Sequence, residues 1–475
     1  MAMRIAHVSS EVVPFSKTGG LADVVGALPA ALAELGHEVT VVTPAHRPNL
    51  ADPVPGQRAG EVKALGMRAA VSRVEHRGVE VLLLDCPPLY ARPSPYTVQD
   101  GEYPDNAMRF AFLARAALLA LAARGGADVV HAHDWQAALA PLLLKTDEEL
   151  RRLLPQDRSV LTIHNMAYQG VFPPWVLEPC GLPRALFSMD SLEFYAMVNF
   201  LKGGLTAADA ITTVSPTYAR EILTPEFGCR LEGVLAARGG AVSGIVNGLD
   251  LEVWDPAADP HLPIGYTSAN VAAGKAAARQ ALAAETGVEA AGRPLAGMVS
   301  RLAEQKGADV LAGALDEIVA LGFDVAVLGT GERRYEEVLA AGEVAHPGRV
   351  RLLRRFDERA AHLIYAASDV FLMPSRYEPC GLGQMSAMRY GTLPVVHRTG
   401  GLVDTVTDAS HRDGTGFVFD AVTPTALLAA LARAKAVLAE PRRLSRMRKA
   451  AMARDFSWAA SARRYVELYE ELTSP

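Results

Sequence analysis

The chain has 475 residues and a formal net charge of −6, with 50% hydrophobic and 21% charged residues. This length suits two large domains better than one or four. The charges are interspersed, which excludes the basic stripe of a nucleic-acid-binding protein and the basic face of a membrane-surface helix. No run of about 18 apolar residues appears, so we expect no membrane span.

The four cysteines are widely spaced and form no Cys-x-x-Cys motif; they are Cys86, Cys180, Cys229 and Cys380. This pattern predicts reduced thiols in a cytoplasmic protein, without a disulfide framework or a zinc site. The short apolar start of the chain is interrupted by Glu11, which favours a buried first strand over a signal peptide.

Short β-branched runs alternate along the chain with helical stretches rich in Ala and Leu. This alternation predicts βαβ units, and the uniformly apolar runs predict strands covered on both faces. The expected strands are Arg4–Ser9, Glu38–Thr43, Val79–Leu84, Val129–Ala132, Val160–His164, Ala210–Val214, Pro294–Ser300, Asp324–Leu328, Val350–Leu353, Val370–Met373 and Leu393–Val396. The predicted fold class is therefore α/β, with a doubly wound parallel sheet in each half.

The domain boundary is predicted within Val246–Asp259, where a strand-like run ends and a Pro- and Asp-rich stretch follows. We assign residues 1–246 to an N-terminal domain and 247–454 to a C-terminal domain. The last segment, about 455–475, is predicted to be a helix, and the sequence leaves open whether it packs back on the first domain. The Pro- and Gly-rich stretch Pro48–Gly60 is predicted to be a surface loop.

The first candidate binding loop is Lys17-Thr-Gly-Gly, between the first strand and a helix that starts near Leu21. The paired Gly19 and Gly20 let a ligand approach the backbone, and the helix start offers free N–H groups to an anion. A plain tight turn is the alternative. A near-repeat, Arg398-Thr-Gly-Gly, leaves open whether the two runs share a role or match by coincidence.

Two further motifs follow strands in the second half of the chain. Arg301 and Lys306 are two cations on one loop, which suits a diphosphate; a solvated helix start is the alternative. Glu378 is followed by Gly381 and Gly383 at a predicted helix start, where a carboxylate can accept sugar hydroxyls and the turn can hold a phosphate. An ordinary surface loop is the alternative there.

Histidines end two strands of the first half. His164 could bind a hydroxyl or shuttle a proton, although a lone histidine is more often structural. His131-Ala-His133 is a pair with metal-binding spacing, but no further ligand has recognisable spacing, so we expect no metal. Trp135 could stack on a sugar or pack in the core.

Six motifs occur in order over nearly the whole chain, from about residue 4 to about residue 465. They are Lys17-Thr-Gly-Gly-Leu-Ala-Asp-Val, His131-Ala-His-Asp-Trp, Thr162-Ile-His-Asn, Val246-Asn-Gly-Leu-Asp, Ser300-Arg-Leu-Ala-Glu-Gln-Lys-Gly and Glu378-Pro-Cys-Gly-Leu. Together they resemble the bacterial glycogen synthases and plant starch synthases. The resemblance implies a GT-B fold, with two Rossmann-like domains facing across a deep cleft.

The resemblance also implies an activity. It is the transfer of glucose from ADP-glucose to the 4-hydroxyl at the non-reducing end of an α-1,4-glucan such as glycogen, with retention of configuration. We therefore expect ADP-glucose and the glucan as partners, and no cofactor, metal, nucleic acid or membrane. The oligomeric state stays open.

The family's functional residues carry over to matching positions of this sequence. The implied catalytic residues are His164, Arg301, Lys306, Glu378 and Asp134. The implied substrate-binding residues are Lys17, Gly19, Gly20, Asp23, Asn247, Phe356, Cys380, Gly381, Leu382 and Gly383. In this scheme Arg301 and Lys306 neutralise the ADP leaving group, and His164, Asn247 and Glu378 hold the glucosyl unit.

Two positions depart from the expected pattern. Phe356 stands where the family commonly has Tyr against the adenine, which keeps the stacking face and loses a hydroxyl. Ser386 stands eight residues after Glu378, where many retaining transferases have a second glutamate. The sequence shows no carboxylate pair of the glycosidase kind, which favours front-face attack assisted by the departing phosphate.

Two other functions are compatible with the motifs. One is a transferase of the same fold that uses UDP-glucose, and the other is a glucan-binding regulator on an inactive scaffold. The Lys-Thr-Gly-Gly loop argues against the first, and the intact set of polar site residues argues against the second. A phosphorylase would need a pyridoxal-phosphate lysine and a much longer chain.

Overall fold

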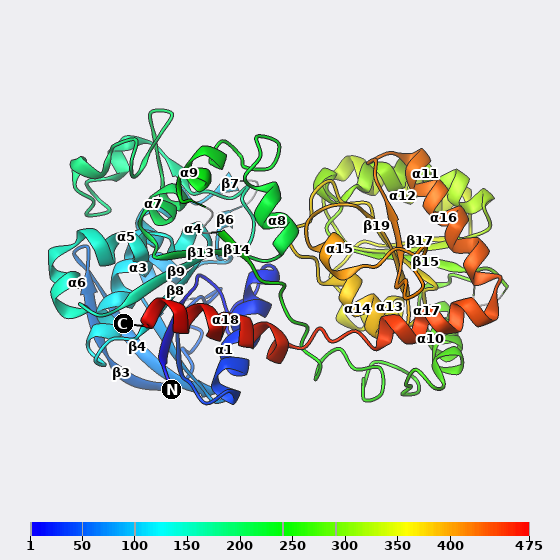
Figure 1. The fold of residues 1–475 in the computed structure, drawn as a ribbon, viewed down its shortest axis with the longest axis horizontal. Coiled ribbons are helices and arrows are strands. Elements are labelled where there is room, and N and C mark those ends of the chain that lie inside the picture. The colour runs from blue at the N-terminus through cyan, green and yellow to red at the C-terminus, as the bar shows by residue number, and fades with distance from the viewer. Residues whose placement is uncertain (1, 50, 99–100, 240–241, 290–291, 475) are drawn as a thin grey trace. The chain divides into compact units, whose positions relative to one another are not determined.

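The computed structural model describes residues 2–49, 51–98, 101–239, 242–289 and 292–474. The chain divides into two compact units (Figure 1). The first unit comprises Met1–Gly248 and Trp458–Pro475, and the second comprises Leu249–Ser457. The division falls after Gly248, inside the predicted interval Val246–Asp259 and two residues beyond the assigned end of the first domain. Asn247 therefore belongs to the first unit.

The first unit is built on a nine-stranded sheet with the order β14-β13-β9-β8-β1-β2-β5-β4-β3. Its strands are β1 (Arg4–Val8), β2 (Glu38–Pro44), β3 (Gln57–Ala64), β4 (Met67–His76), β5 (Val79–Asp85), β8 (Val129–His133), β9 (Arg158–Ile163), β13 (Ala210–Thr213) and β14 (Val242–Gly244). All neighbours are parallel except the β3–β4–β5 edge. The strand order reverses between β1 and β8, and such a switch point is where open α/β sheets bind ligands.

Helices cover both faces of this sheet. Helix α18 lies beside α1 on one face, and α3, α5 and α7 form the core of the other (Figure 1). The helices are α1 (Gly20–Glu34), α2 (Pro87–Tyr90), α3 (Asn106–Ala122), α4 (Asp134–Ala137), α5 (Leu139–Thr146), α6 (Glu148–Leu153), α7 (Phe200–Ala207), α8 (Pro216–Glu221), α9 (Glu232–Ala237) and α18 (Trp458–Thr473). The C-terminal segment therefore completes the core of the first unit.

Small elements decorate the first unit. They are β6 (Thr97–Val98), β7 (Gly101–Glu102), β10 (Val171–Phe172), β11 (Glu193–Phe194) and β12 (Met197–Asn199), with the 3₁₀ turns η1 (Pro174–Val176) and η2 (Arg184–Leu186). Strand β3 begins at Gln57, inside the predicted surface loop Pro48–Gly60, so that prediction is wrong for the last residues of the loop.

The second unit is built on a six-stranded parallel sheet with the order β17-β16-β15-β18-β19-β20. Its strands are β15 (Leu295–Val299), β16 (Asp324–Leu328), β17 (Val350–Leu353), β18 (Val370–Met373), β19 (Leu393–His397) and β20 (Phe417–Phe419). Its helices are α10 (Val271–Thr286), η3 (Glu304–Lys306), α11 (Ala308–Ala320), α12 (Arg333–Ala345), α13 (Glu358–Ala367), α14 (Gly383–Arg389), α15 (Gly400–Thr405), α16 (Pro424–Leu438) and α17 (Pro441–Met452). The order reverses between β15 and β18.

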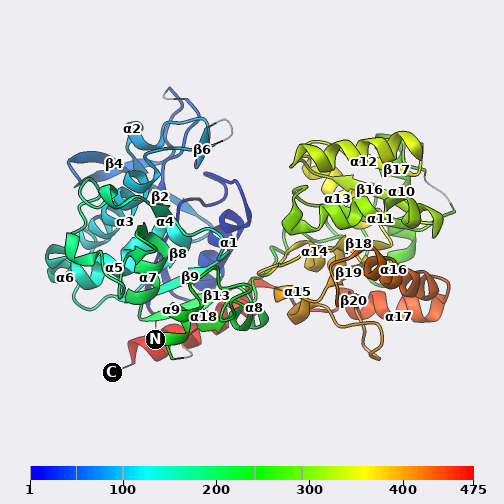
Figure 2. The same cartoon turned by 90° about the horizontal axis from the view of Figure 1, so that it is seen from above.

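The predicted fold class, α/β with doubly wound parallel sheets, is confirmed in both units. Figure 2 shows helices on the two sides of each sheet. Every predicted strand is present, with its ends shifted by at most two residues. No helix in the described part of the chain is long and apolar enough to cross a bilayer, and all four cysteines are free.

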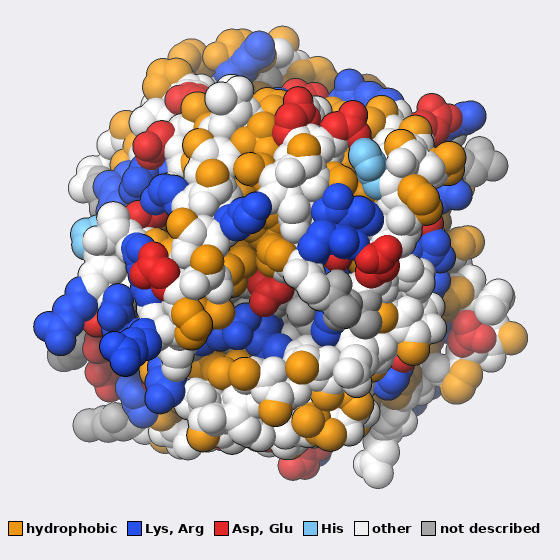
Figure 3. Space-filling view, turned by 90° about the vertical axis from the view of Figure 1, so that its right-hand side faces the viewer, with side chains coloured by type: hydrophobic (Ala, Val, Ile, Leu, Met, Phe, Trp, Pro, Cys, Tyr) orange, Lys and Arg blue, Asp and Glu red, His pale blue; other side chains and the backbone are white. Residues whose placement is uncertain are grey.

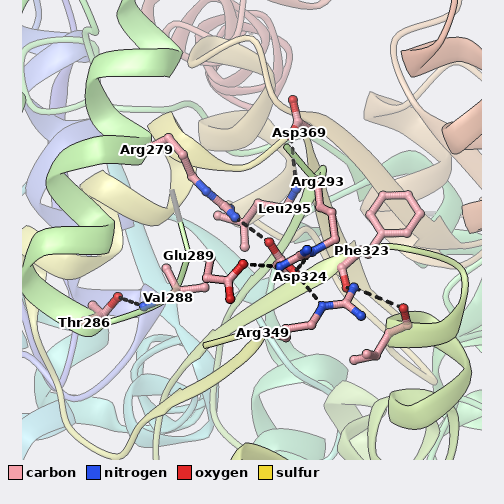
Figure 4. A network of polar contacts seen from close by, with 11 residues as sticks. Arg279, Thr286, Val288, Glu289, Arg293, Leu295, Phe323, Asp324, Arg349 and Asp369 are labelled. Carbon is pink, nitrogen blue, oxygen red and sulfur yellow. Dashed lines mark hydrogen bonds and ion pairs between the residues drawn. The ribbon is translucent and has the colours of Figure 1, made fainter. Parts of the chain in front are cut away.

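A buried ion network anchors the second sheet (Figure 4). Asp324, at the start of β16, has no exposed surface and pairs with Arg279, Arg293 and Arg349 at 2.9, 2.9 and 3.1 Å. A buried carboxylate is tolerated only when it is paired, because its desolvation costs several kcal/mol. The network ties α10 and the segments before β15 and β17 to strand β16.

Candidate active site

The second unit gathers its candidate residues at the carboxyl ends of β15 and β18, the two strands beside the switch point. The Lys306 Nζ atom lies 2.8 and 2.7 Å from the two carboxylate oxygens of Glu378. The Ser375 hydroxyl also donates to Glu378, at 3.0 Å. Glu378 is 5% exposed, and these two donors offset the cost of burying its carboxylate.

A cavity of about 180 Å³ lies above this ion pair. Its lining combines the two predicted motifs and includes Arg301, Lys306, Glu378, Gly381, Leu382 and Gly383. Arg301 is exposed, and its guanidinium donates to the Gln305 side chain at 3.3 Å. Two cations and a backbone loop therefore converge on one hollow, as the binding of a phosphate requires.

Two predicted binding residues lie apart from that cavity lining. Cys380 is buried beneath the loop, and its carbonyl accepts a hydrogen bond from the Gln384 side chain at 3.0 Å. Phe356 follows β17 and is 89% exposed, as suits a ring that stacks on a ligand.

On the face shown in Figure 3, cationic and anionic side chains are interspersed with apolar ones.

The two Thr-Gly-Gly runs have different surroundings. A Cβ atom on Gly400 would lie 1.9 Å from the Glu378 carbonyl oxygen, and the Gly401 N–H donates to that same oxygen at 3.0 Å. Gly19 and Gly20, in contrast, have open space where a Cβ atom would stand. The second run therefore supports the Glu378 loop by close packing, whereas the first leaves room for a ligand.

The Lys-Thr-Gly-Gly loop of the first unit precedes α1. Lys17 and Asp23 form an exposed ion pair of 2.6 Å. Gly19 is the N-cap residue of α1 and has no side chain. The N–H groups of the first turn of α1 therefore donate no hydrogen bond to a capping side chain. The start of α1 therefore combines a cation, open space at both glycines and helix N–H groups without a side-chain cap.

Glu11 is a residue of this site that the sequence reasoning missed. Its carboxylate accepts hydrogen bonds from the Thr18 backbone N–H at 2.5 Å and the Thr18 hydroxyl at 3.0 Å. Glu11 is 3% exposed, and burial raises its pKa. It holds the loop from below, and the only sequence signal was a carboxylate close to Lys17 in an apolar stretch.

Four histidines form a polar layer in the sheet of the first unit: His7, His131, His133 and His164. The first three have no exposed surface, and His164 is half-buried at the carboxyl end of β9. Burial lowers the pKa of His7 and His164 to about 3 and holds the pKa of the other two well below the ordinary value. All four rings are therefore neutral near pH 7.

Asp134 directly follows β8 and faces the same site. It adopts φ of +54°, in the left-handed region that Asp tolerates better than most residues. Its Oδ1 accepts the His164 backbone N–H at 2.7 Å. Burial raises the Asp134 pKa to about 7 despite this hydrogen bond. The structure thus places two predicted catalytic residues, Asp134 and His164, in direct contact.

Asn247 and Trp135 have contrasting positions in the first unit. Asn247 is buried, and its Oδ1 has no hydrogen-bond partner among the described residues. An unpaired buried acceptor costs free energy, which is consistent with a residue that awaits a ligand. Trp135 packs edge-on against Phe110 at 4.9 Å and is a core residue.

The structure adds a third imidazole to the His131–His133 pair. Nitrogen atoms of these two residues and His7 lie within 4.8 Å of one another. However, both ring nitrogens of His131 already have partners, the Tyr469 hydroxyl at 2.7 Å and the Thr162 hydroxyl at 2.5 Å. A metal ion there would have to displace these hydrogen bonds.

Comparisons with known proteins identify relatives of this chain and of its fold. The family model described as starch synthase catalytic domain matches residues 4–237, and the one described as glycosyl transferases group 1 matches residues 284–454. The glycogen synthase of Anaeromyxobacter dehalogenans is 48% identical over 99% of this chain and 100% of its own length. The glycogen synthase of Myxococcus xanthus is 46% identical with the same coverage.

Solved structures agree with these relatives. The catalytic domain of starch synthase IV from Arabidopsis thaliana, bound to ADP and acarbose, has a TM-score of 0.89 and 32% identity, with full coverage of both chains. Sucrose-phosphate synthase from Thermosynechococcus elongatus has a TM-score of 0.64 at 19% identity, which shows the fold alone. The protein is a glycosyltransferase with the GT-B fold. Within that class the chain belongs to the glycogen synthase family.

Proposed function

We propose that this chain transfers glucose from ADP-glucose to the 4-hydroxyl at the non-reducing end of an α-1,4-glucan, with retention of configuration. The observation that carries the proposal is the cavity in which Arg301, Lys306 and Glu378 meet beside a glycine-rich loop. The full-length relatives named glycogen synthase, and the related starch synthase bound to ADP and acarbose, support it.

The cations act on the leaving group. As the bond between the glucosyl carbon and the phosphate oxygen breaks, negative charge grows on the diphosphate, and Arg301 and Lys306 stabilise it. The Lys306 ammonium is held in place by Glu378 at 2.7 Å, so this positive charge is oriented before the donor binds. Preorganised charge of this kind is the largest contribution that such a site makes to rate.

The cavity does not resemble the site of a glycosidase. Among its described lining residues Glu378 is the single carboxylate, whereas a glycosidase needs a pair, one as acid and one as nucleophile or base. We therefore assign front-face attack, in which the departing phosphate oxygen takes the proton of the acceptor hydroxyl. Glu378 accepts sugar hydroxyls in this scheme.

The first unit supplies the remaining contacts. We assign His164 and Asn247 to the glucosyl hydroxyls, and Lys17 with the Gly19–Gly20 turn to the donor diphosphate. The open space at both glycines and the unpaired Asn247 oxygen support these roles. Phe356 is assigned to the adenine ring because its face is exposed. The reaction as proposed uses no metal or cofactor, and the four free thiols favour a cytoplasmic location.

The test is an initial-rate comparison of ADP-glucose and UDP-glucose with glycogen as acceptor. We expect a higher kcat/KM with ADP-glucose and release of ADP equal to glucose incorporated. A preference for UDP-glucose would overturn the donor assignment. Glycogen binding without turnover of either donor would instead identify a regulator on an inactive scaffold.

A further inference from the structure

Three neighbouring strands carry a row of imidazoles towards the candidate active site. In the parallel register β1 pairs with β8 so that His7 faces His131, and β8 pairs with β9 so that His133 faces Thr162. Alternation along each strand puts all these side chains on the α1 and α18 face of the sheet. His164 follows Thr162 by two residues and so continues the row at the edge of the sheet.

Three of the rings are joined in series by hydrogen bonds. The His164 Nε2 atom lies 3.0 Å from His133 Nδ1, and His133 Nε2 lies 2.9 Å from His7 Nδ1. At the inner end, His7 Nε2 is buried and has no hydrogen-bond partner among the described residues. The series therefore starts at an unpaired nitrogen in the core and ends at the site.

The unpaired inner nitrogen sets the direction of the series. Each ring is neutral and carries one N–H, so both hydrogen bonds must point the same way. If they pointed inward, His7 would carry a buried N–H with no acceptor, which proteins avoid. If they point outward, His7 leaves only an unpaired lone pair, which is tolerated more often.

We propose that His7 and His133 are positioning residues that hold His164 as its Nδ1–H tautomer, a hydrogen-bond donor to a sugar hydroxyl oxygen. In this arrangement His7 Nδ1–H donates to His133, and His133 Nδ1–H donates to His164 Nε2. The proton of the His164 ring is therefore on Nδ1, the nitrogen of that ring that makes no hydrogen bond within the series. The same pair of hydrogen bonds fixes the plane of the His164 ring.

Packing alone does not require a histidine at position 7 or 133. An apolar side chain at His7 or His133 would avoid the desolvation of two polar rings. It would also leave His164 free to take the Nε2–H tautomer, which would present an acceptor to the ligand. The link to catalysis rests on the proposed function, but the tautomer itself does not.

The direct test is ¹⁵N NMR of the full chain labelled at histidine, without ligand. The ring nitrogens of a neutral imidazole differ strongly in shift according to which one carries the proton. We expect His164, identified by the signals lost in His164→Ala, to be protonated at Nδ1. Protonation at Nε2 in the wild-type spectrum would overturn the proposal, whatever happens in the variants.

Two variants of His133 separate positioning from packing. In His133→Leu the donor to His164 is lost, so we expect the His164 signals to move towards the Nε2–H pattern and kcat/KM to fall about tenfold, the effect of one hydrogen bond. In His133→Asn the side-chain amide can donate from nearly the same place, so the Nδ1–H pattern and most of the activity should remain. Unchanged His164 signals in a folded His133→Leu would contradict the proposal.

Tyr469→Phe is the matched control. Its hydroxyl bonds His131, on the same face of the sheet but outside the series, at 2.7 Å. This variant should leave the His164 signals and the activity within about twofold of the wild type. A wild-type protein with the Nδ1–H tautomer but no transfer from ADP-glucose would disprove the proposed function and leave this inference intact.

Discussion

Some of the most buried polar groups of the two units differ in charge. The sheet of the first unit holds four neutral histidines and a carboxyl group, Asp134, whose pKa burial raises to about 7. The sheet of the second unit holds ionised pairs, such as Lys306 with Glu378 and the fully buried Asp324 with its arginines. These groups of the first unit avoid the desolvation of charge by neutrality, and those of the second by pairing.

This contrast fits a division of labour. In the proposed function a leaving diphosphate needs fixed positive charge, which Arg301 and Lys306 of the second unit would supply, Lys306 being oriented by Glu378. Sugar hydroxyls need directed hydrogen bonds, which neutral imidazoles supply without a net charge. The predictions below test this contrast, from the largest expected effect to the smallest.

The largest effect is expected for Lys306→Ala. Removing the ammonium takes away charge stabilisation of the leaving group, so kcat should fall about 10³-fold, while affinity for glycogen stays within about twofold. Initial rates and glycogen binding measure the two quantities. Lys435→Ala, which removes an exposed lysine bonded to a backbone carbonyl of the same unit, should leave both unchanged. An unaltered rate in Lys306→Ala would disprove the role of this lysine.

The second prediction concerns stability. Asp324→Asn leaves three arginines around a neutral amide and should destabilise the second unit by about 3–5 kcal/mol, because the buried charges lose their counterpart. Denaturant unfolding followed in the second unit measures this loss. Asp316→Asn, whose carboxylate is 81% exposed, is the control and should have an effect below about 0.5 kcal/mol. Equal effects of the two variants would show that the network does not stabilise the sheet.

The third prediction is that the first unit is more sensitive to mild acid. His7, His46 and His164 have folded pKa values of about 3 and an ordinary value of 6.5. Below pH 6.5 the unfolded chain therefore binds protons that the folded unit does not bind. The free energy of unfolding of the first unit decreases as the pH falls from 6.5 towards 3.

Burial raises the pKa of three carboxyl groups of the first unit, Asp134 to about 7, Asp157 to about 6 and Glu11, and these groups oppose the trend. The six histidines of the unit whose pKa burial lowers outnumber them. In the second unit the pKa of the Asp408 carboxyl is about 2. Its ionised form therefore stabilises the folded state until the pH falls below about 4. Hydrogen exchange resolved by unit, between pH 7 and 4.5, is the measurement. Loss of protection in parallel in both units would contradict the contrast.

The smallest effect is expected for Phe356→Tyr. The substitution adds a hydroxyl at an exposed aromatic face and should lower KM for ADP-glucose by about two- to fivefold, the size of one hydrogen bond. Steady-state kinetics at saturating glycogen measure it. Phe356→Ala should raise the same KM without changing the melting temperature, because the ring is 89% exposed. A KM that neither variant alters would remove Phe356 from the donor site.

The sequence predicted the regular core well, for a simple reason. Strands such as Val370–Met373 and Leu393–Val396 are apolar runs buried in the sheet, and their composition marks them directly. The hairpin of β3 and β4 was missed because its outer strand is mostly exposed and polar, and β3 begins in a Pro- and Gly-rich stretch. The division between the units falls between Gly248 and Leu249, inside the predicted interval Val246–Asp259.

The sequence predicted those residues of the candidate site whose chemical role is visible within a single short motif. Arg301, Lys306 and Glu378 are cations and a carboxylate directly after strands, and the parallel topology brings those strand ends together. Glu11 and His7 were not predicted as site residues, because an isolated Glu or His in an apolar strand has no local signature. Their importance depends on partners that are distant in sequence, such as His133, 126 residues away from His7.

The sequence by itself determined the two α/β sheets, the strand ends that hold the loops and the family to which the motifs point, because periodicity and short motifs are local properties. Only the tertiary structure decided which polar groups are paired, which are neutral and which are exposed. It separated two nearly identical Thr-Gly-Gly runs into one that packs on a carbonyl and one that stays open. Those outcomes depend on desolvation and on contacts between distant segments, which no single stretch of sequence contains.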